Sequence, residues 1–135
     1  MPEQDQESLM KEHREDAGTL IHATIRVVIP VRKRKEVLMV LRSIVEQTRH
    51  IEGCNGCRLY QDLQDERALM LQESWAGEKA LRRHLRSEAF RHILLVVEMA
   101  TEAPEIRFDW ISRSTGIEAI KNARADRKTL TGMIA

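Results

Sequence analysis

The chain has 135 residues, 42% of them hydrophobic and 32% charged, so it should form one domain with its own core. Its formal net charge of +1 gives no argument for binding nucleic acid or an anionic membrane. Because no stretch has the roughly 18 apolar residues of a membrane span, and the N-terminus lacks the apolar core of a signal peptide, we expect a cytoplasmic protein.

The first part of the chain predicts a polar arm, a strand and a helix. Residues 1–19 contain almost no apolar side chains and should form a flexible arm. A β-branched run over residues 22–29 predicts a strand that ends at Pro30. Residues 32–49 carry apolar side chains at helical spacing, and Gly53 should end that helix.

Four consecutive basic residues, Arg32 to Lys35, would occupy the first turn of this helix. The helix dipole disfavours positive charge at that end. The simplest interpretation is a helix start that water and salt solvate. The alternative is a patch for an anion or an acidic partner, or a nuclear-type basic run.

The two cysteines, Cys54 and Cys57, have the spacing of a redox pair or of half a zinc site. The sequence has no second Cys or His pair at a suitable distance, and the motif precedes a strand instead of opening a helix. We therefore expect neither a metal site nor a required disulfide, and interpret both cysteines as small apolar residues beside a turn.

A hairpin and two helical pieces come next. Residues 56–63 and 68–75 predict two strands joined by a polar turn. Helical spacing then covers residues 78–86 and 88–99, and Ser87 is a suitable N-cap for the second piece.

The C-terminal part predicts one more strand and a helix. Residues 104–112 alternate as a strand. Thr115 and Glu118 have the spacing of a capping box for a short helix that runs to about Arg124. We expect residues 125–135 to be loose.

The element order is therefore β-α-β-β-α-β, the ferredoxin-like α+β arrangement of one antiparallel sheet with helices on one face. We expect this domain to span residues 20–113, with an extra C-terminal helix and tail over residues 114–135. The strands carry large side chains on both faces, but the helices can cover only one. A homodimer whose two sheets pack face to face would cover the other.

One histidine lies on the apolar side of a predicted helix. Leu81, His84 and Leu85 share a face because they stand at i, i+3 and i+4. Ring nitrogens that leave water need hydrogen-bond partners. His84 is therefore either a core residue bonded to the backbone or part of a site.

Several short motifs together resemble a known family. They are Glu52-Gly53-Cys54, Arg58-Leu59-Tyr60, Glu73-Ser74-Trp75 and Leu81-x-x-His84-Leu85-x-Ser87-x-x-Phe90. The chain resembles the antibiotic biosynthesis monooxygenase family of dimeric α+β barrels, and within it the quinol-monooxygenase-like members, from about Ile21 to Ser112. The haem-degrading branch is disfavoured, since residues 21–29 contain no Asn and Leu94 stands where a His would be needed.

The resemblance implies a pocket between the sheet and the helices of each protomer. In it a quinol or polycyclic phenol would be oxygenated without a cofactor. His84 matches the helix histidine of the relatives and would be the catalytic base. Tyr60 would hydrogen-bond a substrate oxygen. Aromatic walls and anion-stabilising side chains would complete the pocket: Trp75, Phe90, Arg26 and Arg58.

Each of these residues also has a structural interpretation. Trp75 and Phe90 would be plain core, and Tyr60 would be a half-buried strand residue with its hydroxyl in water. The alternative function is a non-catalytic dimeric module of the same fold that binds or senses a small molecule. Fold alone does not separate an enzyme from such a module. A pocket containing His84 would favour the enzyme, and a filled interior would favour the module.

Overall fold

The computed structural model describes residues 19–134, with side chains as far as residue 126. Four antiparallel strands form one sheet in the order β2-β3-β1-β4. The strands are β1 (Leu20–Val28), β2 (Cys54–Gln61), β3 (Ala68–Ala76) and β4 (Glu105–Ile111). The arm predicted for residues 1–19 lies, apart from Thr19, outside the described residues.

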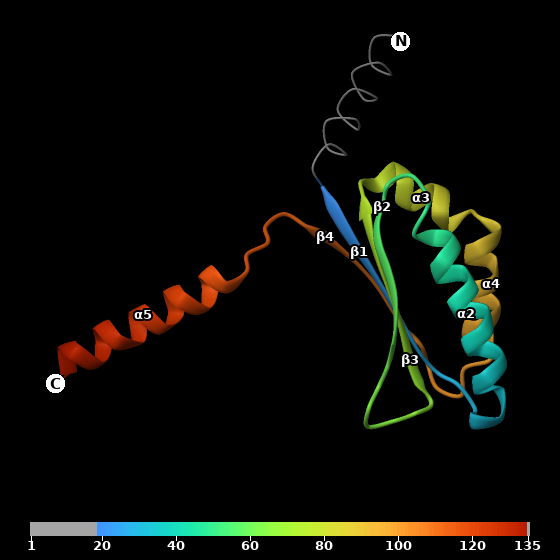
Figure 1. Cartoon of the computed structure of the whole chain (residues 1–135), viewed down its shortest axis with the longest axis horizontal. Coiled ribbons are helices and arrows are strands. Elements are labelled where there is room, and N and C mark those ends of the chain that lie inside the picture. The colour runs from blue at the N-terminus through green and yellow to red at the C-terminus, as the bar shows by residue number, and fades with distance from the viewer. Residues whose placement is uncertain (1–18, 135) are drawn as a thin grey trace, which may run out of the picture.

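Within residues 19–134, three α-helices cover one face of the sheet, and a fourth leaves it (Figure 1). They are α2 (Arg34–Thr48), α3 (Glu78–Leu85), α4 (Glu88–Glu98) and α5 (Ile117–Ile134), and a short 3-10 turn, η1 (Val31–Lys33), precedes α2. The predicted ferredoxin-like α+β fold is confirmed. No helix within residues 19–134 combines the length and the apolar character needed to cross a membrane.

Alternation along the strands decides which side chains meet the helices. The register pairs Ile21 with Trp75 and Cys57 with Glu73, so these four side chains point to the helical side. The core on that side is made of aliphatic side chains from the sheet packed on α2 and α4. Its main members are Ile25, Val27, Val37, Leu41, Ile44, Leu69, Leu71, Phe90, Ile93 and Val96.

The opposite face of the sheet is mixed, and not as apolar as the sequence pattern suggested. Apolar side chains such as Val28 and Met70 lie there among polar and charged ones. The polar group comprises His22, Thr24, Arg26, Arg58, Gln72, Ser74, Arg107 and Asp109. Clearly exposed apolar side chains occur elsewhere, among them Ile106 and Trp110 on β4 and Ile117 on α5.

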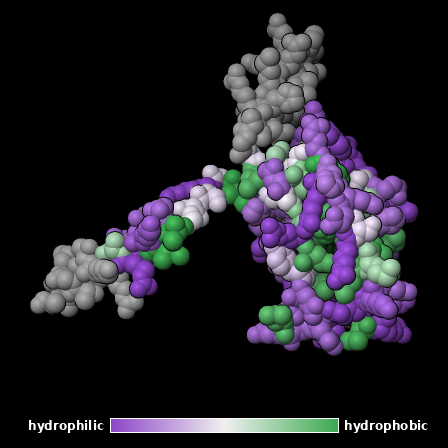
Figure 2. Space-filling model, in the orientation of Figure 1, coloured by the Kyte–Doolittle hydropathy of each residue, from purple (hydrophilic) through white to green (hydrophobic). Residues whose placement is uncertain are grey.

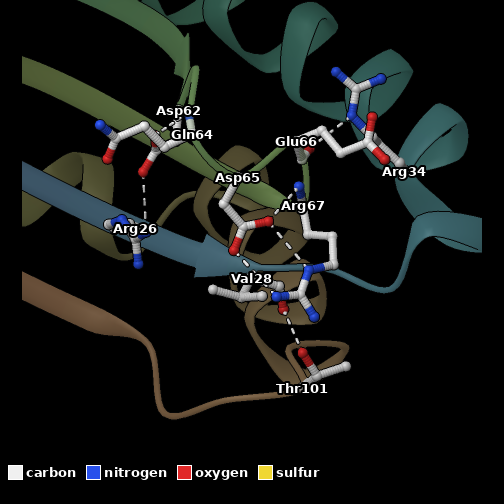
Figure 3. A network of polar contacts seen from close by, with 9 residues as sticks. All are labelled: Arg26, Val28, Arg34, Asp62, Gln64, Asp65, Glu66, Arg67 and Thr101. Carbon is white, nitrogen blue, oxygen red and sulfur yellow. Dashed lines mark hydrogen bonds and ion pairs between the residues drawn. The ribbon is translucent and has the colours of Figure 1, made fainter.

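The basic run forms the η1 turn and the start of α2, and Arg34 ties that start to the β2–β3 loop. Its Nε donates to the backbone oxygen of Glu66 at 2.8 Å, and its Nη2 donates to Oε1 of Gln61 at 2.7 Å. Within the loop, the Asp65 carboxylate accepts from the guanidinium of Arg67 at 3.1 Å (Figure 3). Arg34 therefore has a structural role, because it holds the β2–β3 hairpin against the start of α2.

The C-terminal helix is longer than predicted. The sequence suggested a helix ending near Arg124 and a loose segment over residues 125–135, whereas α5 continues to Ile134. The reason is that the residues after Arg124 include no proline, and Gly132 comes too late to stop the helix earlier.

Candidate functional site

A buried hydrogen bond joins the histidine of α3 to a carboxylate of β3. His84 Nε2 lies 2.8 Å from Oε2 of Glu73, and each side chain is about 1% exposed. The other carboxylate oxygen accepts from Nε1 of Trp75 at 3.4 Å. Glu73 thus holds two ring nitrogens at once, one from its own strand and one from the helix above it.

Aromatic rings enclose this pair. The Trp75 and His84 rings are stacked, with centroids 4.6 Å apart and planes inclined by 29°. The Phe90 and His84 rings meet edge-to-face, with centroids 5.5 Å apart. Ile21 and Leu81 pack against Trp75 and close the cluster toward the N-terminal end of β1. The imidazole is therefore fixed in both position and ring plane.

Tight turns at either end of α3 place His84 over Glu73. Gly77, with φ +99°, precedes the helix, and the connecting segment at Gly53, with φ +89°, approaches it closely. A Cβ at Gly53 would lie 2.4 Å from the Cβ of Ala80. After α3, Ser87 accepts from the backbone N–H of Phe90 and donates to the backbone oxygen of His84 at 2.6 Å. The predicted N-cap is confirmed, and it joins the two helices at the site.

One nitrogen of the histidine is left over. His84 Nδ1 is buried and has no hydrogen-bond partner among the described residues. In the aliphatic core farther along the sheet, the cavity lined by Ile25, Leu41, Leu71 and Ile93 measures only about 10 Å³. The geometry thus provides an oriented imidazole with one free nitrogen in a closed apolar interior.

The predicted site residues divide into two groups. His84, Trp75 and Phe90 lie together, as described above. Tyr60 and Arg58 lie on the outer face of β2, because their neighbours Cys57 and Leu59 point to the core. They do not approach the imidazole.

Arg26 also lies away from His84, on the outer face and near the opposite end of β1. Its guanidinium pairs with Asp62 at 3.4 Å (Figure 3). Tyr60 instead borders an open groove of about 660 Å³ between α2 and β2, together with Arg34, Arg42 and Arg49. The three polar residues expected beside the substrate are therefore not assembled with the histidine in this chain.

Glu73 is the residue that the sequence reasoning missed. The pattern contained a signal for it, because Glu73 shares its strand face with Leu69, Leu71 and Trp75. A single carboxylate on an otherwise apolar strand face requires a buried partner. Its partner, His84, was already singled out by the same argument.

The cysteines lie next to the site and are free thiols. Cys57 is buried beside Glu73, and burial, followed by the negative charge of that carboxylate, raises the pKa of its thiol to about 12. Burial also raises the pKa of Cys54. Among the side chains that the structure describes, no group of three or more His, Cys, Asp or Glu residues is arranged to hold a metal ion.

Comparison with solved structures supports this architecture. A protein from Methanosarcina mazei Go1 is 26% identical, with a TM-score of 0.63 over 72% of this chain and 96% of that one. A crystal structure of an antibiotic biosynthesis monooxygenase is 22% identical, with a TM-score of 0.61 over 70% and 99% of the two chains. A Bacteroides thetaiotaomicron protein of unknown function is 16% identical, with a TM-score of 0.63 over 70% and 100%.

A search of curated proteins finds no match. The family model for antibiotic biosynthesis monooxygenase, by contrast, matches residues 20–94, which is more than half of the chain and contains both Glu73 and His84. The chain belongs to the antibiotic biosynthesis monooxygenase family.

Proposed function

We propose that this protein is a cofactor-independent monooxygenase that acts on a quinol or a polycyclic phenol. The observation that carries the proposal is the buried Glu73–His84 pair with a free Nδ1. A family member needs a base in a dry pocket for this reaction, and the imidazole is the described group best suited to that task.

The pair suits proton abstraction. With Glu73 ionised, Nε2 of His84 carries the hydrogen that it shares with the carboxylate, so Nδ1 presents a lone pair. Nδ1 would take the proton of the substrate hydroxyl, and Glu73 would stabilise the imidazolium that forms. The aromatic rings of Trp75 and Phe90 would contact the substrate ring and exclude water.

The remaining chemistry belongs to the substrate. The phenolate gives one electron to O₂, and the two radicals join at a ring carbon to form a hydroperoxide. Loss of water then leaves a quinone, so one oxygen atom enters the product and the other leaves as water. The substrate supplies all the electrons, and the proton held by His84 returns to the departing oxygen.

The burial of His84 supports a second candidate, a non-catalytic module that senses or binds a small molecule. His84 is only 1% exposed, so a substrate reaches Nδ1 only when α3 moves away from the sheet. The short α3 lies between turns at Gly77 and Ser87, which is where such a movement would be accommodated. An enzyme must open in this way during each turnover, whereas a structural pair never needs to.

Oxygen consumption over a panel of quinols and polycyclic phenols tests the proposal. The decisive variant is His84→Gln, which keeps a donor for Glu73 but has no nitrogen that can take a proton. We expect it to lower turnover by about a hundredfold, as for the loss of a general base. The control is His92→Gln on the exposed side of α4, which should leave turnover unchanged.

Two outcomes would contradict the proposal. One is oxygen consumption that is equal in the wild type and His84→Gln. The other is a wild type that binds panel members, seen as quenching of Trp75, and consumes no oxygen above the uncatalysed rate. That second result would support the binding module.

A further inference from the structure

A groove runs along one edge of the sheet, between α2 and β2. β2 is an edge strand, because the sheet order is β2-β3-β1-β4. The groove has a volume of about 660 Å³, which lies within the roughly 300–1,000 Å³ of pockets that bind small molecules. Its lining contains neither Glu73 nor His84, so the α2–β2 groove is separate from the site described above.

One wall of the groove combines arginines with aliphatic side chains. The side of α2 that lines the groove carries residues at i, i+4, i+8, i+11 and i+15: Arg34, Leu38, Arg42, Val45 and Arg49. Figure 2 shows apolar surface between hydrophilic side chains, in the region where Figure 1 places β2 beside α2. The groove therefore has an apolar floor with positive charge beside it.

The two outer arginines connect α2 to the edge strand. Arg34 Nη2 donates to Oε1 of Gln61 at 2.7 Å, near the start of the helix. At the other end, Arg49 donates from Nε to the backbone oxygen of Cys57 at 3.1 Å and from Nη1 to Oε1 of Glu46 at 3.2 Å. These bonds hold helix and strand together at both ends of the groove, so its two walls are in place before a ligand binds.

Arg42 lies between these two connections and is unpaired. It stands about two helical turns from Arg34 and about two from Arg49. Among the residues whose side chains the structure describes, none forms a hydrogen bond or an ion pair with its guanidinium. Three arginines and one glutamate line the groove, which leaves two positive charges. A free planar guanidinium of this kind matches the oxygens of a carboxylate or a phosphate.

We propose that the α2–β2 groove binds a small organic anion that carries one carboxylate or phosphate group on an apolar ring. The oxygens of that group accept hydrogen bonds from Arg42, and the ring lies on the partly buried side chains of Leu38 and Leu59. Tyr60, which is 41% exposed, lines the strand side of the groove and offers its ring for stacking. This site does not depend on whether His84 is catalytic, because the two share no residue.

The same contacts disfavour larger partners. A peptide that added a strand to β2 would compete with Arg49 for the backbone oxygen of Cys57. A nucleic acid needs a row of free cations, whereas Arg34 and Arg49 are already bonded within the protein. One free guanidinium beside an apolar floor favours a small ligand instead.

Calorimetric titration of the full chain with three naphthalene derivatives tests the groove. 1-Naphthoate and 1-naphthyl phosphate carry the two anionic groups, and 1-naphthamide has the same ring without a charge. We expect the better of the two anions to have a Kd at least about tenfold lower than the amide, the effect of one charge-assisted hydrogen bond. The tighter anion identifies the group that the site prefers. Inorganic phosphate that binds as tightly as this anion would overturn the proposal.

Variants of Arg42 test whether this side chain holds the anion. Arg42→Gln should raise the Kd by about tenfold, and Arg42→Lys should give an intermediate value, because it keeps the charge and loses the planar fork. Arg113→Gln is the matched control, since it removes the same charge from an exposed arginine outside the groove and should leave the Kd unchanged. Arg42 is exposed, so its variants should keep the wild-type melting temperature. Equal Kd values for the wild type and Arg42→Gln would overturn the proposal.

NMR spectra of ¹⁵N-labelled protein locate the bound anion. The backbone amide signals of Arg42 and Tyr60 should shift as the anion is added. The indole N–H signal of Trp75 reports the His84 cluster and should stay in place. A shift at Trp75 without shifts at Arg42 and Tyr60, or no saturable binding up to about 1 mM anion, would overturn the proposal. Neither result changes the oxygen consumption of the wild type, so failure of this site is distinguishable from failure of the proposed enzyme.

Discussion

His84 Nε2 and Glu73 Oε2 lie 2.8 Å apart, between a helix and the strand beneath it, and neither side chain reaches solvent. Such a pair is a poor source of stability by itself, because both groups lose their hydration on burial. Removing one partner is costly, however, since the other is left without a hydrogen bond in an apolar interior.

We therefore predict strong coupling between these two residues. Glu73→Leu and His84→Leu should each lower the free energy of unfolding by about 3–5 kcal/mol, the range for breaking a buried pair. The double variant should lose clearly less than the sum, because neither partner is then stranded. Urea denaturation of the four proteins measures the coupling.

The exposed pair Arg91–Glu88, 3.1 Å apart on α4, provides the control. Its side chains are more than half exposed, so Glu88→Ala should change stability by less than about 1 kcal/mol. Additive losses at Glu73 and His84 would mean that the two groups do not depend on each other.

The sequence predicted the individual partners better than their arrangement. Helical spacing placed His84 with Leu81, whereas Trp75 and Phe90 were expected at the pocket only from the family resemblance, because both faces of the strand that carries Trp75 have large side chains. Which face of β2 turns inward was not decided by local pattern, since Tyr60 and Leu59 are both large. That choice depends on the register with β3 and on the irregularity between Cys54 and Gly56, which are tertiary features.

A second prediction concerns the close approach of Gly53 to α3. Its φ of +89° suits glycine, and an added Cβ would lie 2.4 Å from the Cβ of Ala80. Gly53→Ala should lower the free energy of unfolding by more than about 1 kcal/mol, because backbone strain and a clash add. Gly56→Ala is the control, since nothing lies within 4 Å of a Cβ there. Equal thermal stability of the two variants would contradict this account.

A third prediction uses an unpaired hydroxyl. Thr48, at the end of α2, is fully buried, and its Oγ1 has no partner among the described residues. Thr48→Val keeps the shape and removes the buried polar atom, so it should raise the free energy of unfolding by about 1 kcal/mol. Thr101→Val should instead lower the free energy of unfolding, because the Thr101 hydroxyl donates to the backbone oxygen of Val28 at 3.3 Å. The denaturant midpoint should therefore rise in Thr48→Val and fall in Thr101→Val, relative to the wild type.

The last prediction concerns pH and the thiol of Cys57. Burial, with the charge of Glu73 as the second cause, raises the pKa of this thiol from 9.0 to about 12 in the folded protein. Between these values the unfolded chain loses the proton and the folded chain keeps it. The thiol therefore favours the folded state below about pH 9, and this contribution is lost as the pH rises toward about 12.

Comparison of the wild type with Cys57→Ala measures this effect. At about pH 8 the wild type should be more stable, because alanine leaves a small cavity. From there to about pH 10.5 the wild type should lose about 2 kcal/mol more than the variant, since each pH unit in this range costs about 1.4 kcal/mol. Because the variant lacks the thiol, the difference in free energy of unfolding between the two proteins at high pH reports Cys57 alone. The other groups that titrate there are common to both proteins. Parallel pH profiles would mean that the folded protein does not hold the Cys57 proton more tightly than the unfolded chain does.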